Sequence, residues 1–411
     1  MRKALIGILI LTSLTLGYTY HGCYLLDGPV MAANASAFGM GGVNVLPPSG
    51  ASNGLWAPNR IADKPGIYGS VWTGLTHMNE ERQMPLYDTF EDRVGWKSYV
   101  KSGITYSDFA AFAGYRAENE MIPAIALGYA PLYNTNYTYS EQIREIDGVL
   151  QDQLVGIWRI ESEGRLAGPV VAISEDILEY ATVGISAAFV SGELSMSRSA
   201  PAGDSLSYNA EDWEAVFSAD THYTAEISGT HLTLAAAAYP TERWQIGLRY
   251  SPGMETGDTL YPSLLPGRIG IGIGYLPPGH VVSRFVAEAE MVQYSQLAEE
   301  DSVNYGSLQD IWNFRVGLEH ILHGGMPMRV GAYYKCVPLP ETITRLGFTI
   351  GSGASFGPAE LNVAAGYEMS EYSHHDQFPE TWLPNSPDDR DDYDRVKEGK
   401  LIGSISLDIH F

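Results

Sequence analysis

The sequence is poor in cysteine, in basic residues and in charge overall. Two cysteines in 411 residues exclude a disulfide-stapled scaffold and the common cysteine-rich zinc sites. Lysine and arginine total 25 against 49 acidic residues, so the chain lacks the basic surface that binding to nucleic acid requires. Charged residues make up only 18% of the chain while 45% of residues are hydrophobic, which excludes a disordered acidic protein.

The sequence also lacks a long apolar run. No segment reaches the roughly 18 apolar residues of a transmembrane helix, so a helical membrane protein is excluded. The N-terminus instead carries two basic residues followed by the apolar run Ala4–Gly17, a pattern typical of a secretory signal peptide. We expect residues 1–22 to be this signal peptide, although cleavage after Gly17 or after Gly22 fits the pattern. Cys23 allows a lipoprotein alternative, in which its thiol is acylated.

Export without a helical anchor leaves a soluble exported protein or a transmembrane β-barrel. From about residue 66 onward, apolar residues alternate with small or polar ones, which is the period of two of a β-strand. In residues 269–275, for example, isoleucines and a tyrosine share one face and three glycines share the other. A barrel in lipid has an apolar outer face, a small or polar lumen face and aromatic residues at both interfaces. We therefore predict an all-β, transmembrane antiparallel β-barrel, with a soluble β protein as the alternative.

Aromatic residues near the ends of the predicted strands fit two such interfaces: Trp244, Tyr250, Tyr275, Tyr294, Tyr334 and Tyr367. Fifteen segments fit the strand pattern, among them 154–164, 168–177 and 181–197. Because bacterial barrels normally have an even number of strands, we predict about 14, with one segment of 154–197 in a loop.

The end of the chain supports a barrel. Residues 399–411 alternate regularly and finish on Phe411, a pattern that resembles the signal read by the barrel assembly machinery of the outer membrane. A closed barrel has no free edge, so this strand must pair with the first one. The acidic segment 371–397 just before it is predicted to be an extracellular loop.

The segment before the first predicted strand is rich in small residues. It reads Ala-Ser-Ala-Phe-Gly-Met-Gly-Gly-Val over 35–43 and Ala-Ser-Asn-Gly-Leu-Trp-Ala-Pro-Asn over 51–59. Glycine is costly in helices and strands alike, so the segment is a poor helix and a poor strand, and its composition suits a plug packed inside a lumen. We predict a plug over 23–65 and a barrel over 66–411, with a flexible leader as the alternative for the first segment.

This arrangement, with the segments Thr230–Pro252, Leu265–Ser295 and Trp312–Leu339, resembles the long-chain fatty-acid transporter (FadL/TodX) family of outer-membrane barrels and their PorV-like secretion relatives. One departure is that Trp-Ala-Pro-Asn stands at 56–59, where the family has Asn-Pro-Ala. The resemblance implies an outer-membrane channel of a Gram-negative-type bacterium for passive uptake of hydrophobic small molecules such as long-chain fatty acids. The ligand would pass when the plug shifts and leave sideways through the barrel wall.

The PorV-like relatives imply an alternative function, in which the barrel binds or shuttles cargo proteins at the outer membrane. Either function implies contact with outer-membrane lipid and lipopolysaccharide, and the first adds a hydrophobic small-molecule ligand. Apolar candidates for contact with that ligand or with the lumen wall are Phe38, Met40 and Trp56 in the plug.

Several charged residues fall on the predicted lumen face: Arg249, Arg284, Glu288, Glu290, Arg315, Glu319, Arg329 and Lys335. Buried charges tend to pair, so a structural ladder of ion pairs across neighbouring strands accounts for them. The functional hypothesis beside it is that Arg315 or Arg329 binds a ligand carboxylate.

Motifs of catalysis are not found. The sequence contains no His-Glu-x-x-His, no Gly-x-Ser-x-Gly and no phosphate-binding loop, so we expect no enzyme, no cofactor and no metal site. His374-His375-Asp376 and the acidic run 388–394 could offer oxygen ligands to a divalent cation, but a solvated acidic loop is the favoured interpretation.

Overall fold

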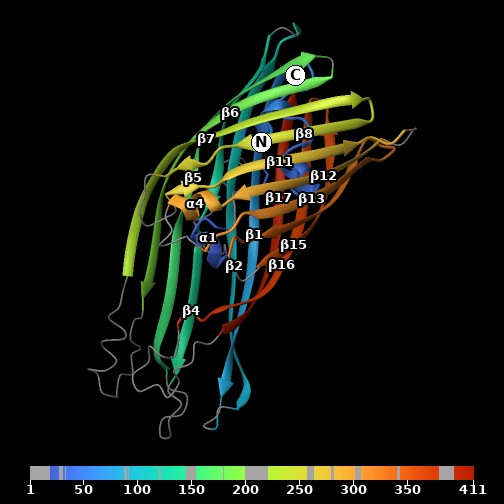
Figure 1. The fold of residues 1–411 in the computed structure, drawn as a ribbon. Helices are drawn as coiled ribbons and strands as arrows, with labels where there is room; N and C mark the ends of the chain where they lie inside the picture. Colours follow the sequence, from blue (N-terminus) through green and yellow to red (C-terminus); the bar gives the residue numbers. More distant parts are fainter. Residues whose placement is uncertain are drawn as a thin grey trace, which may run out of the picture.

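The computed structural model describes residues 19–411 except 27–30, 33, 88–89, 91, 120–121, 145–153, 179, 200–220, 257–262, 279–281, 301–306, 340–342 and 379–392. After the N-terminal segment, most of the described residues lie in β-strands (Figure 1). In this part of the chain, no helix is long and apolar enough to cross a membrane.

The strands form one closed antiparallel sheet. Their bounds are β1 Gly66–Tyr87, β2 Arg93–Arg116, β3 Ala124–Asn134, β4 Tyr137–Arg144, β5 Leu154–Leu178, β6 Ala181–Ser199, β7 Thr221–Thr241, β8 Trp244–Ser251, β11 Gly267–Tyr275, β12 Ser283–Gln293, β13 Ile311–Ile321, β14 Pro327–Cys336, β15 Thr344–Phe356, β16 Ala359–His375 and β17 Tyr393–His410. Because β3 and β4 follow one another along β5, they count as one interrupted strand. The ring then has 14 strands among the described residues, which confirms the predicted barrel.

The first and last strands close the barrel. β1 and β17 pair from Tyr68↔His410 to Gln83↔Arg395. The terminal residue takes part as well, since Ile67 N donates to Phe411 O at 2.8 Å and Phe411 N donates to Ile67 O at 2.9 Å. The final strand predicted from the sequence therefore covers the edge of the first, as closure requires.

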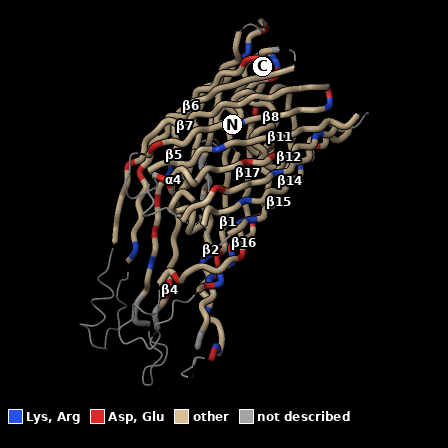
Figure 2. The backbone as a smooth tube through the Cα atoms, in the orientation of Figure 1, with Lys and Arg blue, Asp and Glu red and all other residues tan. Residues whose placement is uncertain are grey.

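The two faces of the wall differ as the alternation predicts. Ile246, Leu248 and Ile271 point outward with 43%, 54% and 51% of their surface exposed, whereas the glycines and charged residues between them face the lumen. Long stretches of strand carry no charged residue (Figure 2). An apolar outer face of this kind is stable against lipid and unstable against water.

The two ends of the barrel are unequal. At one end, which we call the turn end, the connections are two to seven residues long: 117–123, 179–180, 242–243, 276–282, 322–326 and 357–358. At the other end, the loop end, the longer connections lie, and the segment 252–266 there forms a two-stranded sheet of β9 (Met254–Glu255) and β10 (Leu264–Leu265). A helix, α4 (Ser295–Glu300), belongs to the next loop-end connection.

Three expectations need correction. None of the three segments of 154–197 lies in a loop, contrary to the expectation for one of them. The segments 154–164 and 168–177 are one strand, β5, because pairing with β6 continues on both sides of Gly164, whose φ of +145° interrupts the alternation. The acidic loop is shorter than 371–397, since β16 and β17 pair as far as His375↔Tyr393, and residues 379–392 lie outside the described part. Tyr294 is buried inside rather than at an interface, where its hydroxyl donates to Leu26 O at 3.1 Å.

Candidate functional site

The N-terminal segment fills the turn-end half of the lumen. It forms α2 (Ala35–Gly39), η1 (Ala51–Gly54) and η2 (Pro58–Arg60), and nearly every described residue from 34 to 62 is buried. The Asn34 side chain caps α2 by accepting from Ala37 N at 2.7 Å. Gly41 and Gly42 then adopt φ of +80° and +70°, a backbone that side chains rarely allow, and the helix ends there. We call residues 34–62 the plug.

The plug touches the wall through glycines. A Cβ on Gly331 of β14 would overlap the backbone nitrogen of Gly41, and one on Gly317 of β13 would lie 2.5 Å from Met40 O. Further round the ring, a Cβ on Gly247 or Gly270 would lie 2.8 Å from a Val45 methyl group. The missing side chains therefore make the space that the plug backbone occupies.

Polar side chains of the wall, among them Glu288, Thr349 and Ser406, bind the backbone of the plug. The Glu288 carboxylate of β12 accepts from the backbone N–H groups of residues 44, 45 and 46 at 2.8, 3.0 and 2.8 Å. Thr349 Oγ1 of β15 accepts from Gly41 N at 2.8 Å and donates to Gly39 O at 3.1 Å. Ser406 Oγ of β17 accepts from Ala35 N at 3.3 Å.

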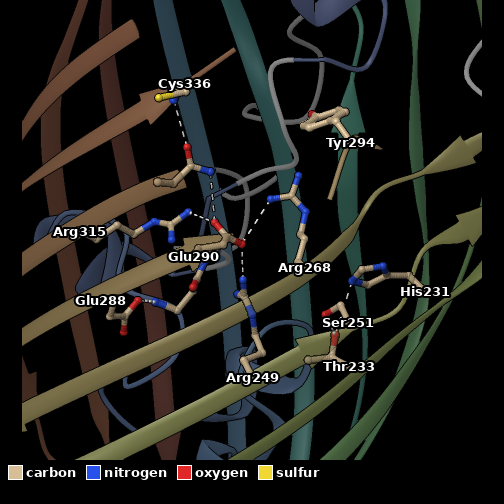
Figure 3. Close-up of polar contacts among 12 residues, drawn as sticks. His231, Thr233, Arg249, Ser251, Arg268, Glu288, Glu290, Tyr294, Arg315 and Cys336 are labelled. Atoms are coloured by element: carbon tan, nitrogen blue, oxygen red, sulfur yellow. Dashed lines mark hydrogen bonds and ion pairs between the residues drawn. The ribbon is translucent and has the colours of Figure 1, made fainter. Parts of the chain in front are cut away.

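A carboxylate surrounded by arginines lies midway along the lumen. Glu290 of β12 accepts from Arg315 at 2.7 Å, from Arg268 at 3.3 Å and from Arg249 (Figure 3). All four side chains are at least 95% buried. We call these four residues the Glu290 cluster. Its buried charge is balanced only in part, because one carboxylate meets three guanidinium groups.

A second set of charges lies toward the loop end, on β1 and β14–β17. Glu368 binds Lys400 at 2.8 Å and Lys335 at 3.3 Å, and Arg345 binds Glu398 at 3.1 Å. We call this set, together with the pair Arg82–Glu80 at 2.7 Å, the loop-end ladder. Of the lumen charges named from the sequence, only Lys335 belongs to this set; Arg249, Glu290 and Arg315 pair in the Glu290 cluster, and Arg329 pairs with Glu319.

Next to the ladder lies a cluster of buried aromatic and apolar side chains, which we call the aromatic chamber; the Tyr137 hydroxyl donates to Glu80 of the ladder at 3.1 Å. Its buried side chains come from β4–β6 and the segment after β16: Tyr137, Tyr139, Trp158, Ile160, Met196 and Phe378. The short helix α1 (Tyr20–Cys23) packs into it, with Tyr20 6.0 Å from the Tyr137 ring. Residues 19–22 were assigned to the signal peptide, most of which lies outside the described residues, yet the structure places 19–22 inside the barrel. Cys23 is fully buried in this cluster.

The barrel wall is interrupted beside this chamber. Among the described residues, β2 and β3 pair only from Ala111↔Tyr129 to Tyr115↔Ile125. Beyond Tyr129, β3 and then β4 stay paired with β5 and not with β2, and the last five residues of β3, 130–134, are all buried instead of alternating outward. Across this interruption, Lys101 Nζ of β2 lies 3.6 Å from the centroid of the Tyr137 ring of β4. We call it the wall opening.

The five predicted ligand residues fall into two groups. Phe38 and Met40 face the wall of β13–β16, where Phe38 Cζ would lie 2.9 Å from a Cβ on Gly366. Arg329 lies in the same region and donates to Glu319 at 2.6 Å and to Asn362 at 2.6 Å.

The other group is at the Glu290 cluster. Arg315 belongs to the cluster itself, and the Trp56 ring lies 5.5 Å from the Arg249 guanidinium and 5.6 Å from the His231 ring. The structure thus does not bring all five residues to one site.

Sequence reasoning missed the plug contact of Glu288 and the pairing of Lys101 with Tyr137. Glu288 was recognised as a lumen charge, but nothing in the sequence says that plug N–H groups face it. Lys101 lies in a stretch where charged and polar residues make the alternation hard to recognise. The signal that could have found it is the length of the β1–β2 pair, which far exceeds the 9–11 residues of a membrane strand.

The fold and the lumen define a 14-stranded barrel closed on itself, with its own N-terminal segment inside. Neither a family model nor a curated protein matches the chain. Solved structures do match along its whole length. A FadL homologue of Pseudomonas aeruginosa is 12% identical, with a TM-score of 0.61 over 94% of this chain and 100% of that one.

Two further similar structures are channels for small hydrocarbons. The monoaromatic hydrocarbon channel CymD is 12% identical, with a TM-score of 0.57 over 93% of this chain and 98% of its own. The toluene transporter TbuX of Ralstonia pickettii is 13% identical, with a TM-score of 0.56 over 94% and 99%. The chain therefore has the fold of the FadL-type outer-membrane channels, as its resemblance to them predicted.

Proposed function

We propose that this protein is an outer-membrane channel for the passive uptake of hydrophobic small molecules, in a Gram-negative-type bacterium. The observation that carries the proposal is the wall opening beside the aromatic chamber, in a barrel whose lumen is blocked by the plug. In bacterial barrels the short turns face the periplasm, so the loop end faces outward. A solute that enters at the loop end reaches the chamber before it reaches the plug.

The route follows from solubility. An apolar molecule is poorly soluble in water, and a water-filled pore offers it no favourable environment. The polar lipopolysaccharide layer outside the membrane is a barrier for the same reason. The chamber offers aromatic side chains, and the wall opening leads from it toward the hydrocarbon of the membrane. The solute can thus pass from chamber to lipid without crossing the plugged half of the lumen.

The ligand class rests on the resemblance and on the neighbours. Long-chain fatty acids are the ligands implied by the family, while the similar channels are described for toluene and monoaromatic hydrocarbons. We retain Phe38, Met40 and Trp56 as proposed contacts on the plug. Arg315 and Arg329 remain the proposed partners of a ligand carboxylate, which would have to share them with Glu290 and Glu319.

The test is to close the wall opening. Both native cysteines are first replaced, by Cys23→Ser and Cys336→Ser. Lys101→Cys and Tyr137→Cys are then joined by a short bifunctional reagent that forms a disulfide with each thiol. Uptake of oleate and of toluene into proteoliposomes is then compared before and after reduction of the linker. The matched control is Glu163→Cys with Ser195→Cys, which are directly opposite each other on β5 and β6.

We expect the first cross-link to reduce uptake of at least one of the two solutes about tenfold or more, and the control cross-link to leave it unchanged. Reduction should restore uptake. Full uptake through the cross-linked wall would contradict a sideways route, and transport of neither solute by the unmodified protein would contradict hydrophobic uptake.

A further inference from the structure

The strongest polar contact between plug and wall is the one made by Glu288. One carboxylate accepts three consecutive backbone N–H groups, those of Asn44, Val45 and Leu46. Successive N–H groups that point to one side form a concave anion site, and hydrogen bonds to a carboxylate are roughly twice as strong as neutral ones. Thr349 and Ser406, by comparison, offer the plug only neutral hydroxyl groups.

The same strand holds this loop from its other side. Arg284, four residues before Glu288 and on the same face of β12, donates to Leu46 O at 2.8 Å and to Gln245 at 3.2 Å. One strand therefore binds both the N–H and the C=O group of Leu46. The rest of this loop touches the wall through Val45, which packs against Gly247, Gly270 and Gly272 without further polar contact.

The backbone on either side of these three residues is conformationally restricted. Gly41 and Gly42 precede the three residues in the left-handed conformation, and Pro47 and Pro48 follow them. Proline restricts the residue before it to extended conformations, so Leu46 has few alternatives. The three N–H groups lie in a short, bounded loop that can bind or release a carboxylate as a unit.

We propose that Glu288 is the positioning residue that latches the plug in the lumen, by holding the backbone amides of residues 44–46. This inference rests on the proposed channel function for its consequence, because a latched plug keeps the turn-end half of the lumen closed. The latch consists of hydrogen bonds, so it can be tested without any solute. Without Glu288, three buried N–H groups would lose their acceptor while the glycine contacts remain.

The experiment is residue-resolved hydrogen exchange on the full-length, detergent-solubilised barrel. Glu288→Ala removes all three acceptors, and we expect amides 44–46 to exchange at least about tenfold faster than in the wild type. Glu288→Gln keeps one acceptor oxygen, so it should release Asn44, which binds the other oxygen, more than Leu46. The matched control is Glu368→Gln, which neutralises a lumen carboxylate that binds Lys400 and Lys335 in the loop-end ladder and should leave amides 44–46 protected.

Protection of the β12 amides shows that each variant is folded. If Glu288→Ala does not fold, Glu288→Gln tests the proposal by the order in which the amides of Asn44 and Leu46 lose protection. A carboxylate with a merely structural role would not free the Asn44 amide before the Leu46 amide. Exchange of residues 44–46 within about twofold of the wild type in the folded Ala variant, or equal release of Asn44 and Leu46 in the Gln variant, would overturn the proposal.

A second readout separates the latch from the channel function. We expect the ion current of Glu288→Ala in planar bilayers to exceed that of the wild type severalfold, because the turn-end lumen opens to water. Faster exchange with unchanged uptake of oleate and toluene would keep the latch and contradict a role for plug release in uptake. A lack of uptake by the wild type would contradict the proposed function and leave the exchange result standing.

Discussion

The two halves of the lumen are lined by opposite kinds of side chain. At the turn end, the wall presents glycines, and the plug backbone lies directly on the strands. At the loop end, the wall presents long charged side chains that meet one another across β1 and β14–β17. The first arrangement depends on the absence of side chains and excludes water by close contact. The second depends on ion pairs and remains polar.

This difference bears on the route of the proposed uptake. The glycine-lined half is filled, so nothing passes along the axis there. In the loop-end half, the aromatic chamber lies against the charges of β1, since the Tyr137 hydroxyl donates to Glu80 at 3.1 Å and the Arg82 guanidinium lies 5.2 Å from the Tyr139 ring. The wall opening lies beside the chamber.

The largest expected effect comes from the Glu290 cluster, at the boundary between the halves. Glu290→Gln would leave three buried guanidinium groups without their carboxylate, and a broken buried ion pair costs about 3–5 kcal/mol. We expect the free energy of unfolding in urea, followed by tryptophan fluorescence, to fall by this amount. A loss below about 1 kcal/mol would show that the cluster does not hold the halves together.

The next effect breaks the glycine-lined half. Gly331→Leu would place a side chain where Gly41 of the plug lies, and overpacking of this kind costs about 1–3 kcal/mol. We expect the barrel to fold with the plug displaced, so that trypsin cleaves after Arg60. Gly324→Leu, in a turn where a Cβ meets nothing within 4 Å, is the control and should leave the plug resistant. Equal resistance of both variants would contradict the account of the glycines.

A smaller effect is expected at the wall opening. The Lys101 ammonium over the Tyr137 ring is a cation–π contact, worth about 0.5–2 kcal/mol. A double-mutant cycle of Lys101→Met and Tyr137→Leu should measure a coupling of this size. Since the Tyr137 hydroxyl also donates to Glu80 at 3.1 Å, Tyr137→Phe is the control that removes this bond and keeps the ring. No coupling in the Leu cycle would mean that the two strands are not joined here.

The smallest effect is expected at an ion pair outside the lumen. Glu371 of β16 and Arg395 of β17 bind each other with about half of each side chain exposed. Exposed pairs contribute about 0–1 kcal/mol and are screened by salt. Glu371→Gln should therefore change the stability by less than about 1 kcal/mol, and a loss as large as that of Glu290→Gln would contradict the difference between buried and exposed charges.

The sequence predicts most of the strands of the wall but few of the contacts between the wall and the plug. The alternation in residues such as 269–275 reflects lipid on one face of the strand and lumen on the other. It can therefore be recognised in the sequence of that strand alone, without knowing which strand pairs with it. It fails in β5 at Gly164, where one backbone conformation joins two segments that look separate.

The plug contacts could not be predicted for a different reason. Gly331 and Gly41 are 290 positions apart, and nothing local to either specifies that they touch. The charged residues of the lumen can be recognised in the sequence, but the partners of their side chains depend on strand register, which the sequence does not show. The wall opening is a failure of pairing between β2 and β4, and a lost pairing leaves no mark in the composition of either strand.

The central claim is that an apolar solute occupies the aromatic chamber and leaves through the wall opening. The most direct measurement is the anomalous scattering of bromine in crystals of the protein grown with a long-chain fatty acid brominated at its terminal carbon. We predict bromine density inside the barrel, between Trp158 and Tyr137. Bromine density on the lipid-facing outside alone, with none between Trp158 and Tyr137, would contradict it.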